Sequence, residues 1–82
     1  MYSLFYTETA LKQLKKFEKK VQIRIISGLE RIRIRPYPHV KKLVDSPYFR
    51  FRIGYYRVIL DIKEDKLVLL VIEVGHRKNI YK

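Results

Sequence analysis

Two prolines divide this chain into a part with helical periodicity and a part with strand periodicity. Pro36 and Pro38 end the helical pattern, because proline lacks a backbone donor and restricts the residue before it. Before them, apolar residues recur at offsets of three and four, and from Tyr48 onward they alternate with charged ones. The segment that ends at Pro47 is predicted to be a loop. The bulk of the chain is therefore expected to form helices first and strands afterwards.

The part before the prolines is predicted to hold one strand and a helical hairpin. Residues 2–6 are short, apolar and aromatic, as in a strand, and Thr7 supplies a hydroxyl of the type that caps a helix start. The first helix is predicted over residues 8–17, with these residues on its packed side: Leu11, Leu14 and Phe17. Its lysines are interpreted as a solvated face.

The second helix is predicted over residues 20–35, with this apolar stripe: Val21, Ile25, Leu29 and Ile32. Three further isoleucines lie off the stripe, namely Ile23, Ile26 and Ile34. They could form a docking surface or the edge of a wide core, and the core interpretation is slightly favoured.

Three strands are predicted after the loop. Residues 48–53 place Phe49, Phe51 and Ile53 on one face and Arg50 with Arg52 on the other. Gly54 allows a tight reversal into a strand over residues 55–62. Residues 67–74 are almost wholly apolar, so they are predicted to form the central strand, covered on both faces.

Composition limits the chain to one small unit. Its 82 residues, 48% of them hydrophobic, suffice for a single core, so residues 1–82 are expected to form one domain. The chain has no cysteine and only two histidines, His39 and His76, so neither a disulfide framework nor a metal site is expected, and no cofactor is expected. No apolar run approaches the roughly 20 residues that span a bilayer, and residues 1–10 lack an export signal. A cytoplasmic protein is expected.

The formal charge of +11 indicates a polyanionic partner. Lysine and arginine number 19 against eight acidic residues, and such a field attracts nucleic acid or an acidic protein. A merely solubilising surface is the bland alternative. Binding to a membrane is disfavoured, because it would need a long helix with one basic and one strongly apolar face.

The cations gather in the strand region, where they alternate with aromatic residues. Arg50 and Arg52 share a face, and a hairpin through Gly54 is expected to bring Arg57 beside them. Guanidinium groups bind phosphate oxygens in a two-pronged geometry, and aromatic rings stack on unpaired bases. Arginines on an edge strand can also serve only to prevent aggregation, and His76 can be an ordinary surface residue.

At these residues the chain resembles the RelE/ParE superfamily of toxins from toxin–antitoxin pairs. The resemblance covers nearly the whole chain and rests on the following motifs in order: Ala10, Leu11, Lys12 and Leu14; Lys42 and Leu43; Tyr55, Tyr56, Arg57, Val58 and Ile59; Val74, Gly75, His76 and Arg77; Ile80 and Tyr81. It implies an α+β fold in which a helical hairpin packs on a small, mostly antiparallel four-stranded sheet, in the order β-α-α-β-β-β. It also implies that a cognate antitoxin, RelB-like, wraps around the protein and holds it inactive.

The resemblance implies an activity as well. RelE-like members are ribosome-dependent endoribonucleases that cut messenger RNA in the A site, by metal-free attack of the ribose 2′-hydroxyl on the adjacent phosphate. Carried over position by position, their active site falls on these residues: Arg50, Arg52, Arg57, Arg77 and Tyr81. ParE-like members instead inhibit DNA gyrase without cutting nucleic acid, and this is the alternative function.

This chain departs from part of the family in its proton acceptor. Some RelE-like toxins have lysines where Arg50 and Arg52 stand here, and arginine stays protonated at physiological pH, so it is a poor base. Histidine gives and takes protons near neutrality. His76 is therefore expected to do the acid and base work, from an irregular tail past the last strand that folds back to the arginine face together with Arg77 and Tyr81.

Overall fold

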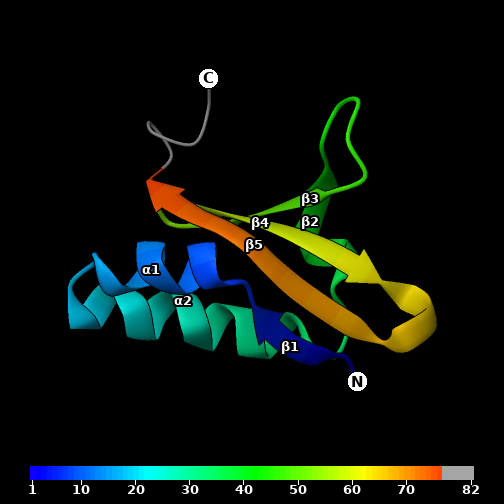
Figure 1. Ribbon diagram of the computed structural model, residues 1–82. Coiled ribbons are helices and arrows are strands. Elements are labelled where there is room, and N and C mark those ends of the chain that lie inside the picture. The colour runs from blue at the N-terminus through cyan, green and yellow to red at the C-terminus, as the bar shows by residue number, and fades with distance from the viewer. Residues whose placement is uncertain (77–82) are drawn as a thin grey trace.

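Two helices lie on one side of a twisted sheet in this computed structural model, which describes residues 1–76 (Figure 1). The elements, in chain order, are β1 (Ser3–Tyr6), α1 (Glu8–Lys15), α2 (Lys19–Ile32), the 3₁₀ turn η1 (Tyr37–His39), β2 (Val40–Lys42), β3 (Phe49–Ile53), β4 (Tyr56–Lys63), the 3₁₀ turn η2 (Glu64–Lys66) and β5 (Val68–His76). The α+β class and the helical hairpin are as predicted.

The sheet has five strands in the order β1-β5-β4-β3-β2, not the predicted four. The additional strand is β2, which lies inside the segment predicted to be a loop. It pairs antiparallel with β3. Its three residues are too few to show a sequence period, and its pairing partner starts seven residues later. β1 pairs parallel with β5, and the remaining pairs are antiparallel. The sheet is therefore mostly antiparallel, as predicted.

The helix boundaries follow from local chemistry. α1 begins after Thr7, whose hydroxyl accepts a hydrogen bond from the Ala10 amide at 3.1 Å. α2 ends at Ile32, three residues before its predicted end. A proline ring clashes with the carbonyl four residues earlier, and four residues before Pro36 is Ile32.

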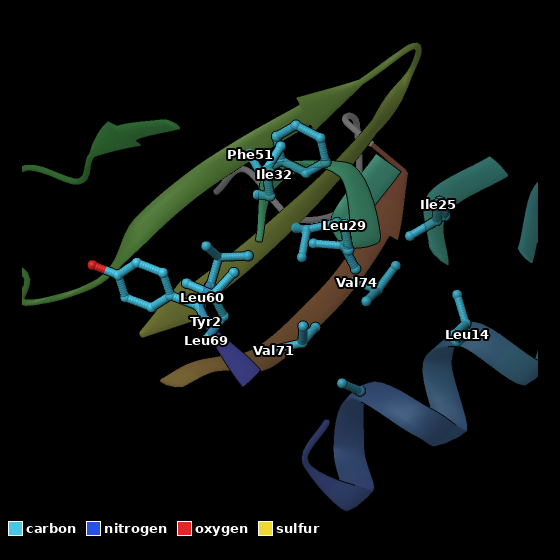
Figure 2. Packing of buried hydrophobic residues seen from close by; sticks show 12 residues of the cluster. Tyr2, Leu14, Ile25, Leu29, Ile32, Phe51, Leu60, Leu69, Val71 and Val74 are labelled. Atoms are coloured by element: carbon cyan, nitrogen blue, oxygen red, sulfur yellow. The ribbon is translucent and has the colours of Figure 1, made fainter. Parts of the chain in front are cut away.

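The core lies between the helices and the sheet face that they cover. The α2 residues Ile25, Leu29 and Ile32 are buried, which confirms most of the predicted stripe. They pack with residues from three strands (Figure 2): Phe51, Val58, Leu60, Leu69, Val71 and Val74. α1 contributes Ala10 and Leu14 instead of Leu11, which is exposed.

Two predictions about burial are wrong. Ile23, Ile26 and Ile34 are exposed, because they point away from the single sheet that the helices cover. β5 is an inner strand, but it is not covered on both faces: the helices pack on one face only, and Glu73 is exposed. Its continuous apolar run leaves Leu70 and Ile72 half-buried.

The start of α1 is attached to the edge of β5 beyond the end of β1. The Thr7 amide donates to the Val71 carbonyl at 2.9 Å, and the Thr7 hydroxyl donates to the Ile72 carbonyl at 3.1 Å. The Gln13 side-chain oxygen accepts from the Val74 amide at 2.7 Å. β1 is too short to pair with the whole edge of β5. Thr7 and the side chain of Gln13 therefore supply hydrogen-bond partners for backbone groups of β5 beyond the end of β1.

Candidate nucleic-acid interface

The strand register separates the arginines from the core. Phe51 pairs across the hairpin with Val58, and both are buried under the helices. Neighbouring residues on a strand point to opposite faces, so Arg50, Arg52 and Arg57 belong to the other face, which no helix covers. We call this the open face. The predicted arginine cluster therefore forms on one surface.

Arg52 and Arg57 stand directly opposite each other in the β3–β4 register. Like charges in that position repel each other. Arg52 is exposed and Arg50 is half-buried. Lys41 pairs with Arg50 from β2, which extends the cationic surface to the sheet edge.

Arg57 differs from the other two arginines in its burial. It is 6% exposed, and within residues 1–76 it is the one charged side chain that is buried. Its partner on β5 is Gly75, which has no side chain. An arginine keeps its charge in such a place, and a charge held in a fixed position is suited to a phosphate at a defined distance.

Two carboxylates of the described residues belong to the open face, namely Asp61 and Glu73. Asp61 is bound by Lys63, with 3.0 Å between the carboxylate oxygen and the ammonium nitrogen. The hydrogen bond that Lys63 donates to Asp61, followed by the negative charge of that carboxylate, raises the pKa of Lys63. Glu73 lies across from Ile59 and is the nearest other carboxylate in the β4–β5 register. The open face thus keeps a net positive charge at its β3–β4 end.

His76 does not lie in the position predicted from the sequence, which was a tail folded back to the arginine face. β5 continues through His76, so the residue is not part of an irregular tail. It pairs with Tyr56, one position past the pair of Arg57 and Gly75, and so takes the helix side of the sheet. The ring of Tyr56 contacts Phe17 between the helices, at 5.2 Å between centroids, which confirms that side. His76 and Arg57 therefore leave the sheet on opposite faces, at the same end.

The His76 ring lies among tyrosines. Its centroid is 5.6 Å from that of Tyr56, edge to face, and 6.4 Å from that of Tyr55, with the Tyr55 ring nearly parallel at 6°. His76 is half-buried, whereas Tyr55 is 67% exposed. Tyr55 is exposed because it sits in the β3–β4 turn.

Arg77 and Tyr81, the other two residues expected in the site, lie outside the described residues. Sequence reasoning missed Arg24 of α2, an exposed residue whose guanidinium lies against Gly54 in the β3–β4 turn. A helical cation is indistinguishable from a solvated surface residue in a sequence. Only the packing of α2 on the hairpin places it beside the strand arginines.

No cluster of three or more His, Asp or Glu side chains in residues 1–76 could hold a metal ion. In the same part of the chain, neither helix has the length and apolar character needed to cross a membrane.

A comparison with known protein families found a match over almost the whole chain. A sequence profile of the family described as "ParE toxin of type II toxin-antitoxin system, parDE" matches residues 4–81. No curated protein sequence matched the chain.

Solved structures share the fold over almost the whole chain. The intact RelBE toxin–antitoxin complex of Escherichia coli has a chain that is 26% identical, with a TM-score of 0.81, covering 93% of this chain and 96% of its own. The RelB–RelE complex of Methanococcus jannaschii gives 26% identity and a TM-score of 0.73, covering 94% of both chains. The RelBE2 complex of Mycobacterium tuberculosis gives a TM-score of 0.86 at 23% identity, covering 93% and 98%, and this last likeness concerns the fold alone.

Proposed function

This chain belongs to the family of ParE toxins of type II toxin–antitoxin systems, and on that premise we propose that it acts by cutting messenger RNA in the ribosomal A site. The likeness to RelE chains at 26% identity supports this choice within the superfamily. The observation that carries the proposal is the open-face cluster, in which Arg52 and Arg57 stand opposite each other beside Arg50. An inhibitor that acts through protein contacts alone has no need of such a cluster.

The proposed reaction needs no cofactor. The ribose 2′-oxygen forms a bond to the adjacent phosphorus, and the bond from phosphorus to the 5′-oxygen breaks. A 2′,3′-cyclic phosphate and a 5′-hydroxyl result, with one proton removed from the 2′-hydroxyl and one delivered to the 5′-oxygen. Negative charge grows on the non-bridging oxygens meanwhile, and fixed cations such as Arg57 stabilise it. Arg50 and Arg52 would position the phosphate.

Proton transfer is assigned to His76. Of the two residues beyond the described part, Arg77 is assigned with Arg57 to the charge of the transition state, and Tyr81 to base stacking, orientation of the 2′-hydroxyl or proton transfer. His76 leaves the sheet on the helix side, but it is the last residue of β5. An RNA strand that crosses the open face and passes over this end would meet its ring. A His76→Ala variant is expected to lose the pH dependence of cleavage between pH 6 and 9. Equal rates for wild type and variant across that range would remove His76 from the mechanism.

Cleavage on ribosomes tests the activity itself. Purified ribosomes carrying a defined message are mixed with the protein, and breaks are mapped by primer extension. We expect breaks at the A-site codon and a loss of about 10²–10³ in rate for Arg57→Ala. Arg31→Ala removes an equal charge from exposed helix surface and is expected to cut at the wild-type rate. Intact message with the wild-type protein would contradict the proposal.

A second candidate function is inhibition of DNA gyrase, as in ParE-like toxins. The matching family profile carries the ParE name, and arginines replace a lysine base in the cluster. Intact message together with gyrase trapped on cleaved DNA would favour this candidate.

The partner that we propose is a cognate antitoxin of the RelB type, because the E. coli and M. jannaschii structures are complexes of RelE with RelB. An acidic partner would also offset the charge of +11. Co-expression with a neighbouring open reading frame is expected to rescue growth and to raise the thermal midpoint of the purified toxin. A midpoint that does not change on adding the antitoxin would argue against coupled stabilisation.

A further inference from the structure

The β3–β4 turn carries cations from both layers of the molecule. Gly54 stands in this turn with a φ of +59°, and a Cβ built on it would lie 2.9 Å from Nη2 and 3.1 Å from Cζ of Arg24. The guanidinium group of Arg24 therefore lies against the backbone of the turn. From the other side, Arg52 Nε donates to the Gly54 carbonyl across 3.5 Å. Two exposed guanidinium groups thus flank a residue that has no side chain.

An exposed aromatic ring follows immediately. Tyr55 is 67% exposed, and its ring stacks on His76, which in turn contacts Tyr56. The Tyr55 ring thus has a parallel ring beside it, while much of its surface stays in solvent. A solvent-exposed tyrosine next to a turn that carries two arginines has the chemistry of a platform for an unpaired base with a cation for its phosphate.

The exposed Tyr37 differs from Tyr55 in the charge that lies beside it. Tyr37 is also exposed, but it lies near the opposite end of β3, where its ring contacts Phe49. Its hydroxyl donates to Glu64 across 3.3 Å, and Glu64 lines the pocket there with Tyr2. A carboxylate in that position repels phosphate.

We propose that the β3–β4 turn binds one nucleotide of single-stranded RNA, with the base stacked on Tyr55 and its phosphate held by Arg24. The inference rests on the proposed function, because it extends the RNA path from the open-face cluster around the end of the sheet. Arg24 and Tyr55 are positioning residues in this arrangement, since they hold RNA beside the reacting phosphate without taking part in the chemistry.

Binding of an RNA that cannot be cut tests the subsite separately from the nuclease. The probe is a fluorescently labelled hexamer of 2′-O-methyl uridylate, in which the attacking hydroxyl is blocked. Fluorescence anisotropy measures its affinity for the full chain between 50 and 200 mM salt. Each phosphate contact on a single strand contributes about 0.7 to the slope of log K against log salt concentration.

Matched variants test the charge of Arg24 and the ring of Tyr55 separately. We expect Arg24→Gln to weaken binding and to lower that slope by about 0.7. Arg31→Gln removes an equal charge about 10 Å further along α2 and should leave the slope unchanged. We expect Tyr55→Ala to weaken binding about tenfold with an unchanged slope, whereas Tyr55→Phe, which keeps the ring, should bind like wild type.

The subsite and the nuclease can fail independently. Equal effects of Arg24→Gln and Arg31→Gln, wild-type affinity of Tyr55→Ala, or no binding of the hexamer by the wild type would overturn the subsite. Cleavage of ribosome-bound message could still occur in each of these cases. The expected pattern of variant affinities together with uncut message would keep the subsite and remove the nuclease.

Discussion

Gly54 shows how much one residue can constrain at the scale of a side chain. Its φ of +59° lies in the left-handed region, where a Cβ costs about 1–2 kcal/mol. Contact with Arg24 adds less, since a guanidinium at the end of a flexible side chain can move. The turn therefore depends on glycine mainly through its backbone.

We expect Gly54→Ala to lower the free energy of unfolding by about 1–2 kcal/mol, measured by urea denaturation. Gly54→Asn should cost less, because asparagine tolerates this backbone region better. An alanine variant as stable as the wild type would mean that the turn can adopt another conformation.

At the scale of elements, α1 is held along β5 by two side chains. The Thr7 hydroxyl both caps α1 and donates to Ile72, and Gln13 accepts from the Val74 amide. We expect Thr7→Ala to destabilise the fold by about 1–2 kcal/mol in urea. Thr9→Ala, at an exposed position of α1, should cost much less. Equal losses for the two variants would contradict a specific role for Thr7.

α2 approaches β3 most closely at Gly28. A Cβ there would come within 2.5 Å of Ile53 Cδ1 and 3.4 Å of Phe51 Cε2. We expect Gly28→Val to destabilise the fold by about 1–3 kcal/mol through overpacking. Ser27→Val introduces the same side chain on the exposed side of α2 and serves as the control. A Gly28→Val variant no less stable than Ser27→Val would show that the helix can shift away from the sheet.

At the scale of the whole molecule, the charge of +11 is a source of self-repulsion. Salt shortens the Debye length from about 30 Å at 0.01 M to about 8 Å at 0.15 M. We therefore expect the thermal midpoint to rise by a few degrees between these concentrations of sodium chloride. Calorimetry with sucrose at matched osmolarity provides the control. A midpoint that falls with added salt would indicate that ion pairs outweigh the repulsion.

Hydrophobic periodicity predicted the long helices and strands well, because each of them buries one face in the core between the helices and the sheet. The stripe of Ile25, Leu29 and Ile32 is an example. β2 was not predicted, because three residues are too few to show the alternation of a strand. They form a strand because they pair with β3. The side of His76 was also mispredicted, because it depends on β5 continuing two residues beyond Val74.

The sequence by itself determined the class of fold, the positive charge, and the shared face of Arg50 and Arg52, because these depend on composition and on the two-residue period of a strand. Tertiary structure alone decided that Arg57 is buried opposite Gly75, that His76 turns towards Tyr55 and Tyr56, and that Arg24 joins the turn at Gly54. These positions depend on strand register and on helix packing, and both are set by contacts between residues far apart in the chain.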